Sequence, residues 1–129
     1  GDAMTDAPAV QILALEPETL TVPSGQEVTA LDVVLNAPGP DGPATRFRFL
    51  APAIARDGGS VDFAQASGDM LALCQDFALT KLSALNVSNG QVIISLSDRA
   101  VEFGQSDEAA TQFFEAYRIE DGACIWEAF

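Results

Sequence analysis

The chain has 129 residues, 48% of them hydrophobic, and a mean hydropathy of +0.18. This length favours a single domain, and this composition excludes a disordered acidic tail. Nineteen acidic residues against six basic ones give a net charge of −13, which disfavours nucleic acid and anionic membrane surfaces as partners. The apolar runs are only a few residues long, so we expect no membrane insertion.

The amino terminus predicts a flexible arm over residues 1–9, followed by one domain over residues 10–129. Met4 does not stand at the first position, so we interpret Gly1 as a cloning remnant. Either a signal peptide has been removed or Met4 is the natural start. The two cysteines favour the first interpretation, because disulfides persist in oxidising compartments.

Short runs of alternating apolar residues predict strands. They cover residues 10–15, 19–22, 27–35, 46–50 and 91–97. The turn residues Pro23-Ser24-Gly25-Gln26 predict a hairpin between the second and third runs.

One segment changes to the helical period, with apolar residues at i, i+3, i+4 and i+7. These residues are Met70, Leu73, Cys74 and Phe77. They predict one long helix over about residues 65–86, with Asp62 or Ser67 as its cap.

Residues 107–118 fit either a helix or a strand. Asp121-Gly122 favours the strand, because this dipeptide between alternating runs is a strong hairpin signal. We therefore predict a hairpin of residues 112–119 and 123–129, with residues 106–111 forming one helical turn. Its register pairs Ile119 with Cys124 and turns that cysteine towards the core.

Cys74 lies in the apolar stripe of the helix, so both cysteines face the predicted helix–sheet interface. We expect a disulfide between Cys74 and Cys124, whose loop of about fifty residues makes it worth roughly 4 kcal/mol. Two free buried cysteines, acting as small hydrophobic residues, are the alternative.

The elements predict an α+β fold, a mostly antiparallel sheet of five to seven strands with one long helix packed on one face. If the strands that flank the helix are parallel neighbours, the connection between them is a right-handed crossover.

Four stretches of the chain resemble an uncharacterised family of small exported bacterial proteins, a domain of unknown function. They are VPSGQ (22–26), RFRFLAPAIARDGGSVDF (46–63), DMLALCQDFAL (69–79) and the block from ISLSDR to the last residue (94–129). The resemblance covers about residues 20–129. It implies a periplasmic or secreted protein with both cysteines, and it implies no catalytic residue.

The chain has no histidine, which excludes Ser-His-Asp and Cys-His triads and histidine metal sites. We expect neither a cofactor nor a metal. Loop oxygens could also form a calcium site, but solvated turns are favoured. The loop residues concerned are Asn36, Asp41, Asp107 and Glu108. Lys81 is interpreted as a solvated helix residue rather than a Schiff-base lysine.

Paired-carboxylate catalysis stays open, with Asp98 and Glu115 as the main acid–base candidates and Glu102 and Asp107 behind them. Glu115 is singled out because the hairpin register puts it on the aromatic face. There it would have a raised pKa or an arginine partner, and a structural role is favoured.

Four arginines lie on or beside strands in a chain that is otherwise poor in positive charge. They are Arg46, Arg48, Arg99 and Arg118. If their strands are neighbours, they would form a cationic patch that grips a carboxylate or phosphate through two hydrogen bonds. The alternative is pairing with Glu102, Glu120 and Glu127.

The sequence leaves the function unknown. The favoured expectation is a non-catalytic periplasmic binding or accessory domain for a small ligand or an envelope protein. The alternatives are an enzyme that uses carboxylates and arginine without histidine or a transition metal, and a structural homodimer built on a sheet edge.

Overall fold

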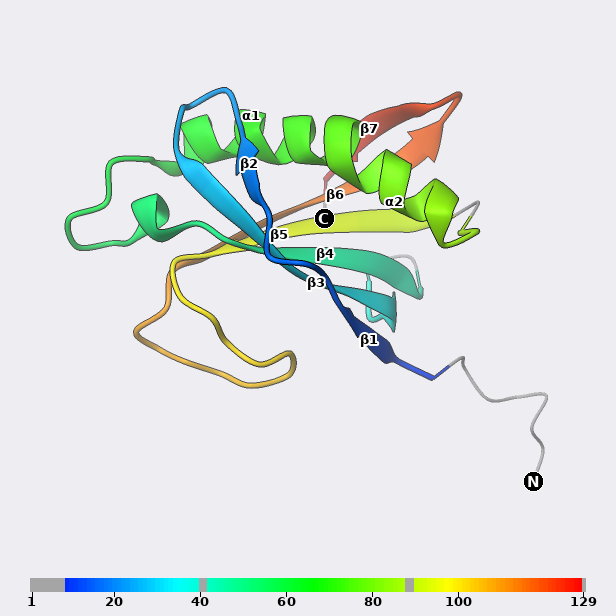
Figure 1. Cartoon of the computed structure of the whole chain (residues 1–129), viewed down its shortest axis with the longest axis horizontal. Helices are drawn as coiled ribbons and strands as arrows, with labels where there is room; N and C mark the ends of the chain where they lie inside the picture. Colours follow the sequence, from blue (N-terminus) through cyan, green and yellow to red (C-terminus); the bar gives the residue numbers. More distant parts are fainter. Residues whose placement is uncertain (1–8, 40–41, 88–89, 129) are drawn as a thin grey trace.

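The computed structural model of the chain describes residues 9–39, 42–87 and 90–128. Seven strands form one sheet, and a single helical run crosses one of its faces (Figure 1). The α+β fold predicted from the sequence is therefore confirmed. The arm predicted for residues 1–9 lies outside the described residues except for Ala9.

The strands are β1 (Gln11–Ala14), β2 (Thr19–Thr21), β3 (Glu27–Ala37), β4 (Ala44–Leu50), β5 (Gln91–Ser97), β6 (Gln112–Glu120) and β7 (Ala123–Glu127). The helical elements are the short 3₁₀ turn η2 (Pro52–Ile54) and the continuous run α1 (Phe63–Leu73), η3 (Cys74–Ala78) and α2 (Leu79–Ala84). The segment η3 is a π-helical turn inside that run.

The strands follow the order β1-β3-β4-β5-β6-β7, and β2 pairs with β3 beyond the end of β1. Among the strands of the described residues, only β4 and β5 are parallel, and the helical run connects them. The expected parallel neighbours and both expected hairpins are present. At the second hairpin Asp121 and Gly122 have φ values of 51° and 75°, as a tight two-residue turn requires.

The core lies between the helical run and the sheet face below it. Phe47 and Phe49 of β4 point into it and make edge-to-face contacts with Phe77. From β5, Ile94 and Leu96 are fully buried on the same side. Burying these large side chains is the main driving force for the fold.

The helical run begins at a capping box. The Asp62 side chain accepts a hydrogen bond from the Gln65 amide, and the Gln65 side chain accepts one from the Asp62 amide. Of the two caps considered, Asp62 is the correct one. The run ends near Asn86, which has a φ of 59°.

Cys74 and Cys124 form a disulfide between the helical run and β7, which confirms the predicted pair. A second connection joins α1 to the turn between β2 and β3. The carboxylate of Asp69 is fully buried and accepts hydrogen bonds from the Ser24 amide, the Ser24 hydroxyl and the Gln26 side chain. Because three donors surround it, this buried charge is satisfied.

The opposite face of the sheet carries the loop between β5 and β6, which spans residues 98–111 and extends away from the helical run (Figure 1). Residues 106–111 contain a turn rather than the expected helical turn. Within the described residues, no helix has the length and apolar character needed to cross a bilayer.

Candidate functional site

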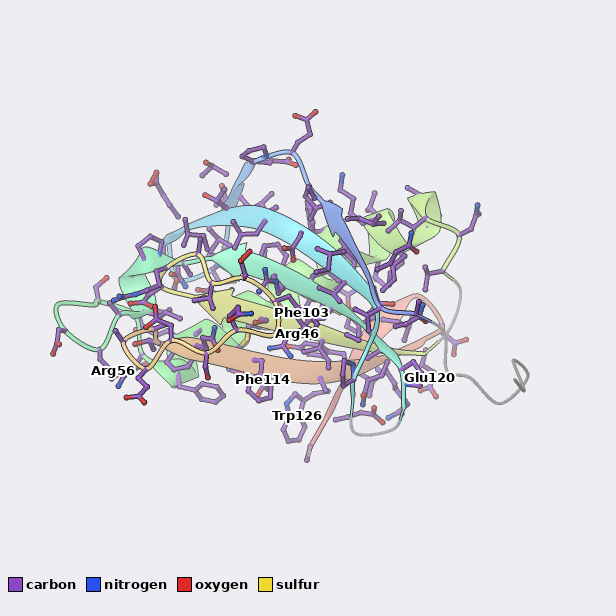
Figure 2. The ribbon with its side chains drawn as sticks, turned by 90° about the horizontal axis from the view of Figure 1, so that it is seen from below. Arg46, Arg56, Phe103, Phe114, Glu120 and Trp126 are labelled. Atoms are coloured by element: carbon purple, nitrogen blue, oxygen red, sulfur yellow. A yellow bond between two sulfur atoms is a disulfide. The ribbon has the colours of Figure 1, made fainter. Side chains whose placement is uncertain are left out.

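Strand alternation decides which side chains reach the face under loop 98–111. Because Phe47 and Phe49 point into the core, Arg46 and Arg48 of β4 point to the other face. Ser95 of the parallel strand β5 lies beside them and supplies a hydroxyl. Figure 2 looks onto this face and shows Arg46 near Phe103 of the loop.

Arg48 is fully engaged in holding the structure together. Its guanidinium donates two hydrogen bonds to the Asp32 carboxylate, at 2.7 and 2.9 Å, and a third to the Val101 carbonyl at 2.8 Å. Its charge also lies 5.7 Å from the centre of the Phe103 ring. Arg48 therefore fixes the start of the loop against β3 and β4.

Arg46 has fewer polar partners, although its guanidinium lies 5.5 Å from the centre of the Phe114 ring. Its Nη2 donates a 3.3 Å hydrogen bond to the Ser95 hydroxyl, and its buried Nε has no hydrogen-bond partner among the described residues. Among the described residues, no carboxylate forms an ion pair with it. Burial, and secondarily the charge of Arg48, lowers the pKa of Arg46. Its guanidinium is thus a poorly solvated cation with unused donors.

These two arginines line a pocket of about 280 Å³ between the sheet and the loop, which we call the Arg46 pocket. Its polar lining consists of Arg46, Arg48, Ser95, Glu102, Gln105 and Gln112. Phe103 and Val101 add apolar surface. The volume lies just below the usual range for small-molecule sites.

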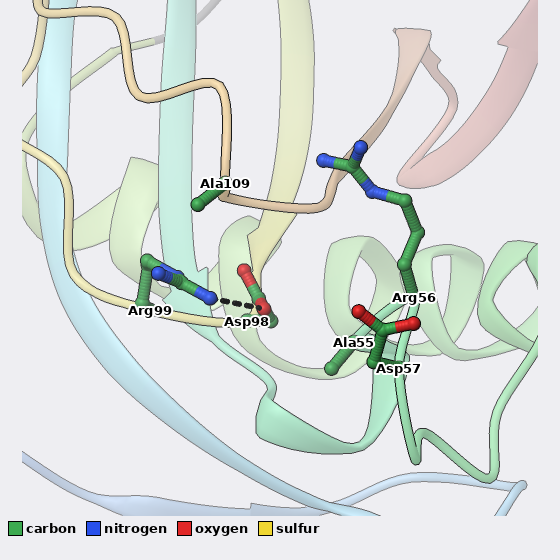
Figure 3. A pocket seen from close by; sticks show the side chains of 6 residues that line it. All are labelled: Ala55, Arg56, Asp57, Asp98, Arg99 and Ala109. Atoms are coloured by element: carbon green, nitrogen blue, oxygen red, sulfur yellow. Dashed lines mark hydrogen bonds and ion pairs between the residues drawn. The ribbon is translucent and has the colours of Figure 1, made fainter.

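A second pocket, of about 270 Å³, lies where the two ends of loop 98–111 meet, a place we call the loop neck. It is lined by Arg56, Asp57, Asp98 and Arg99 (Figure 3). The Asp98 side chain is only 5% exposed and accepts a hydrogen bond from the Thr111 amide at 2.8 Å. Its other oxygen lies 3.4 Å from Arg99. Asp98 thereby closes the loop neck.

Arg56 completes this neck from the other side. It donates hydrogen bonds to the carbonyls of Glu108 and Ala110 and to the Thr111 hydroxyl. Its Nε and Nη2 groups therefore bond to the end of the loop. Its visible role is to position the end of the loop.

The structure separates the four predicted arginines. Arg46 and Arg48 share one pocket, Arg99 lines the second, and Arg118 lies elsewhere on β6. Arg118 is 46% exposed and pairs with Glu120 at 3.4 Å and Glu127 at 3.7 Å.

The two acid–base candidates are also separated. Glu115 lines a groove on the helix side of the sheet, where it accepts a hydrogen bond from the Trp126 indole. Asp98 lines the pocket at the loop neck on the other side. Of the weaker candidates, Glu102 lines the Arg46 pocket, and Asp107 caps a turn by accepting the Ala109 amide.

Of the residues named for calcium, none belongs to a group of three or more histidine, cysteine, aspartate or glutamate side chains in the described part of the chain. Asp41 lies outside the described residues. Asn36 donates a hydrogen bond to the Ala9 carbonyl.

Lys81, interpreted from the sequence as a solvated helix residue, lies on the helical run with its ammonium group 5.3 Å from the centre of the Phe77 ring.

Sequence reasoning missed Arg56, Ser95, Gln105 and Gln112. Arg56 follows a 3₁₀ turn and fits no strand pattern, so nothing in its neighbourhood signalled a role. The polar residues Ser95 and Ser97 follow the apolar run Val92–Ile94 in β5, and both are buried. Polar side chains in a buried strand were the signal that could have indicated a site on that face.

A family model described as "Family of unknown function (DUF6497)" matches residues 4–129, and the chain belongs to this family. Searches of curated proteins and of solved structures found no match.

Proposed function

We propose that this member of the family of unknown function is a non-catalytic periplasmic binding domain, and that the Arg46 pocket holds a small carboxylate ligand. The observation that carries the proposal is the state of Arg46, a partly buried guanidinium with unused donors and no ion pair among the described residues. A guanidinium and a carboxylate match each other in a two-bond geometry.

The contrast with Arg48 supports this assignment. Arg48 has a carboxylate partner in Asp32 and serves the fold. Arg46 lies two residues away on the same strand face, and burial lowers its pKa without a compensating acid. A bound anion would supply the missing charge, and the interaction is strong where water is largely excluded.

The charges around the pocket favour a carboxylate over a phosphate. The chain carries a net charge of −13, and Glu102 lies at the pocket itself. A doubly charged phosphate meets more repulsion there than a singly charged carboxylate. Gln105 and Gln112 add groups that can donate and accept hydrogen bonds with a polar ligand body.

The location rests on separate support. A disulfide joins the helical run to β7, and disulfides persist in oxidising compartments. The resemblance to exported bacterial proteins points the same way. Alkylation of protein taken directly from its host cells, followed by mass spectrometry, tests the location: oxidised cysteines support it and free thiols contradict it.

Calorimetric titration with a series of small monocarboxylates, each paired with its neutral amide, tests the binding function. The carboxylates should bind and the amides should not. Arg46→Gln should weaken binding at least about tenfold, as loss of a charged hydrogen-bond pair predicts. Arg118→Gln, an exposed arginine outside the pocket, is the matched control. Equal binding by Arg46→Gln and the native chain would overturn the proposal.

The enzyme and homodimer alternatives remain predictions. Any activity found in a substrate screen should disappear in the Asp98→Asn, Glu115→Gln double variant if those acids act in catalysis. A homodimer should give a mass that rises with concentration in sedimentation experiments.

A further inference from the structure

A groove on the helix side of the sheet is separate from both pockets. It has a volume of about 320 Å³ and lies between α1 and the strands β6 and β7. Its apolar wall is unusually exposed: Phe63 is 47%, Leu71 44% and Trp126 56% accessible. Large apolar side chains gathered on a surface mark interaction sites.

One charged group, Glu115, lines this groove. The Trp126 indole donates a hydrogen bond to one of its oxygens. In the part of the chain that the structure describes, no arginine or lysine forms an ion pair with Glu115. Tyr117 lines the groove as well, and its buried hydroxyl has no hydrogen-bond partner within the described ranges of the chain. The groove therefore offers a negative charge among apolar walls.

Beside the groove, the backbone edge of β7 is partly occupied by Gln75 and is open to another strand at Trp126. β7 is the outermost strand, and its Cys124 amide points outwards, where the Gln75 side chain accepts it at 3.0 Å. Outward and inward groups alternate along a strand, so the amide and carbonyl of Trp126 also point outwards. Of the backbone hydrogen bonds among the described residues, none engages Trp126 on that side.

We propose that the groove binds an extended peptide segment that carries a lysine side chain. The peptide adds to β7 beside Trp126, and its lysine enters the groove. The aliphatic stem lies against Phe63, Leu71 and Trp126, and the ammonium group meets Glu115. Strand addition supplies affinity through the main chain, and such pockets supply specificity. The indole face adds a favourable cation–π contact.

Charge favours a foreign partner over a second copy of this chain. Two copies bring together net charges of −13 each. The only lysine of the chain is Lys81, which lies on the helical run over the Phe77 ring rather than in an extended segment. A peptide from a basic partner avoids this charge repulsion and can present a lysine in an extended segment.

Three capped five-residue peptides test the proposal, with lysine, norleucine or glutamate between β-branched neighbours. Trp126 is the only tryptophan, so its fluorescence reports binding directly. The lysine peptide should bind at least about tenfold tighter than the norleucine peptide, and the glutamate peptide should bind weakest. Methylation of the peptide nitrogen that faces the Trp126 carbonyl should abolish binding.

Two variants separate this site from the Arg46 pocket. Glu115→Gln keeps an acceptor for the indole, so the fold is retained, and it should remove the preference for lysine over norleucine. Arg46→Gln should bind the lysine peptide as the native chain does. Equal affinity for lysine and norleucine would overturn the proposal, as would unchanged binding by the methylated peptide or a dimer that occupies the Trp126 edge.

Discussion

Cys74 of the helical run and Cys124 of β7 lie with their Cα atoms 6.3 Å apart and form a disulfide across fifty positions of sequence. The side chain of Gln75, the next residue, donates a hydrogen bond to the Gly122 carbonyl and accepts one from the Cys124 amide. The same helical turn therefore contacts the hairpin through the disulfide and through these two bonds. The hairpin also carries Tyr117, Trp126 and Glu115, which line the groove beside α1.

Removal of the disulfide should lower stability substantially. The double variant Cys74→Ala, Cys124→Ala should lose roughly 4 kcal/mol of unfolding free energy and melt roughly 10–20 °C lower, because closing a fifty-residue loop restricts the unfolded chain. Thermal melts with and without a reductant measure this. The reductant should leave the double variant unchanged, and a native chain that melts identically when reduced would contradict the prediction.

Of the acidic residues, Asp69 should contribute most to the free energy of unfolding. Asp69→Ala leaves Ser24 and Gln26 without their acceptor and should cost about 2–4 kcal/mol. Asp76→Ala, at an exposed position of the same helical run, is the control and should change stability by less than about 0.5 kcal/mol. Urea unfolding measures both, and equal effects would count against the role of Asp69.

The single tyrosine gives a pH prediction. Burial, and secondarily the charge of Glu115, raises the pKa of Tyr117 above its ordinary value of 10.0. Above pH 10 the unfolded chain loses a proton that the folded chain keeps, so this contribution to stability is complete below pH 10 and is lost as the pH rises further.

Ultraviolet titration of tyrosinate checks this. Tyrosinate should appear only together with unfolding, and Tyr117→Phe should show a weaker loss of stability with alkali. A smooth titration near pH 10 in a chain that stays folded would contradict the buried hydroxyl.

The two neighbouring arginines of β4 should behave oppositely. Arg48→Gln removes the two-bond pair with Asp32 and the link to Val101, so it should cost about 1–3 kcal/mol and speed amide exchange at Gln105 in the loop. Arg46→Gln removes a poorly solvated cation that has no ion pair in the part of the chain that the structure describes, so it should leave stability unchanged or raise it. Denaturant titration distinguishes them, and a larger loss at Arg46 would indicate that it serves the fold.

Much of the fold follows from local patterns. The alternation of RFRFL fixes which face of β4 enters the core, and Asp121-Gly122 resolves the ambiguous segment before it as a strand. The hairpin register then places Cys124 opposite the helix, which made the disulfide predictable.

A bulge in β3 was not predictable from these patterns. The pairing with β4 shifts between Ala30 and Asp32, so the buried positions change parity within the strand. This shift turns Asp32 towards Arg48. The sequence suggested glutamates as partners for the arginines, and for Arg48 the structure provides Asp32 instead.

The site itself depends on contacts between distant segments. Loop 98–111 is held by Asp98 with Thr111, by Arg56 with the loop carbonyls and by Arg48 with Val101. The periodic pattern of apolar residues does not predict such contacts, because each joins single polar groups that are far apart in sequence. The four arginines were therefore identifiable, but their division between separate surfaces was not.

The nitrogen-15 spectrum of the arginine Nε–H groups tests at the guanidinium itself whether Arg46 binds a carboxylate. The chain has five arginines, and single glutamine variants assign their signals. Addition of a small carboxylate that binds the chain should shift the Arg46 signal and leave that of Arg118 in place, whereas the neutral amide should shift neither. An unchanged Arg46 signal at saturating carboxylate would show that the ligand does not bind this guanidinium.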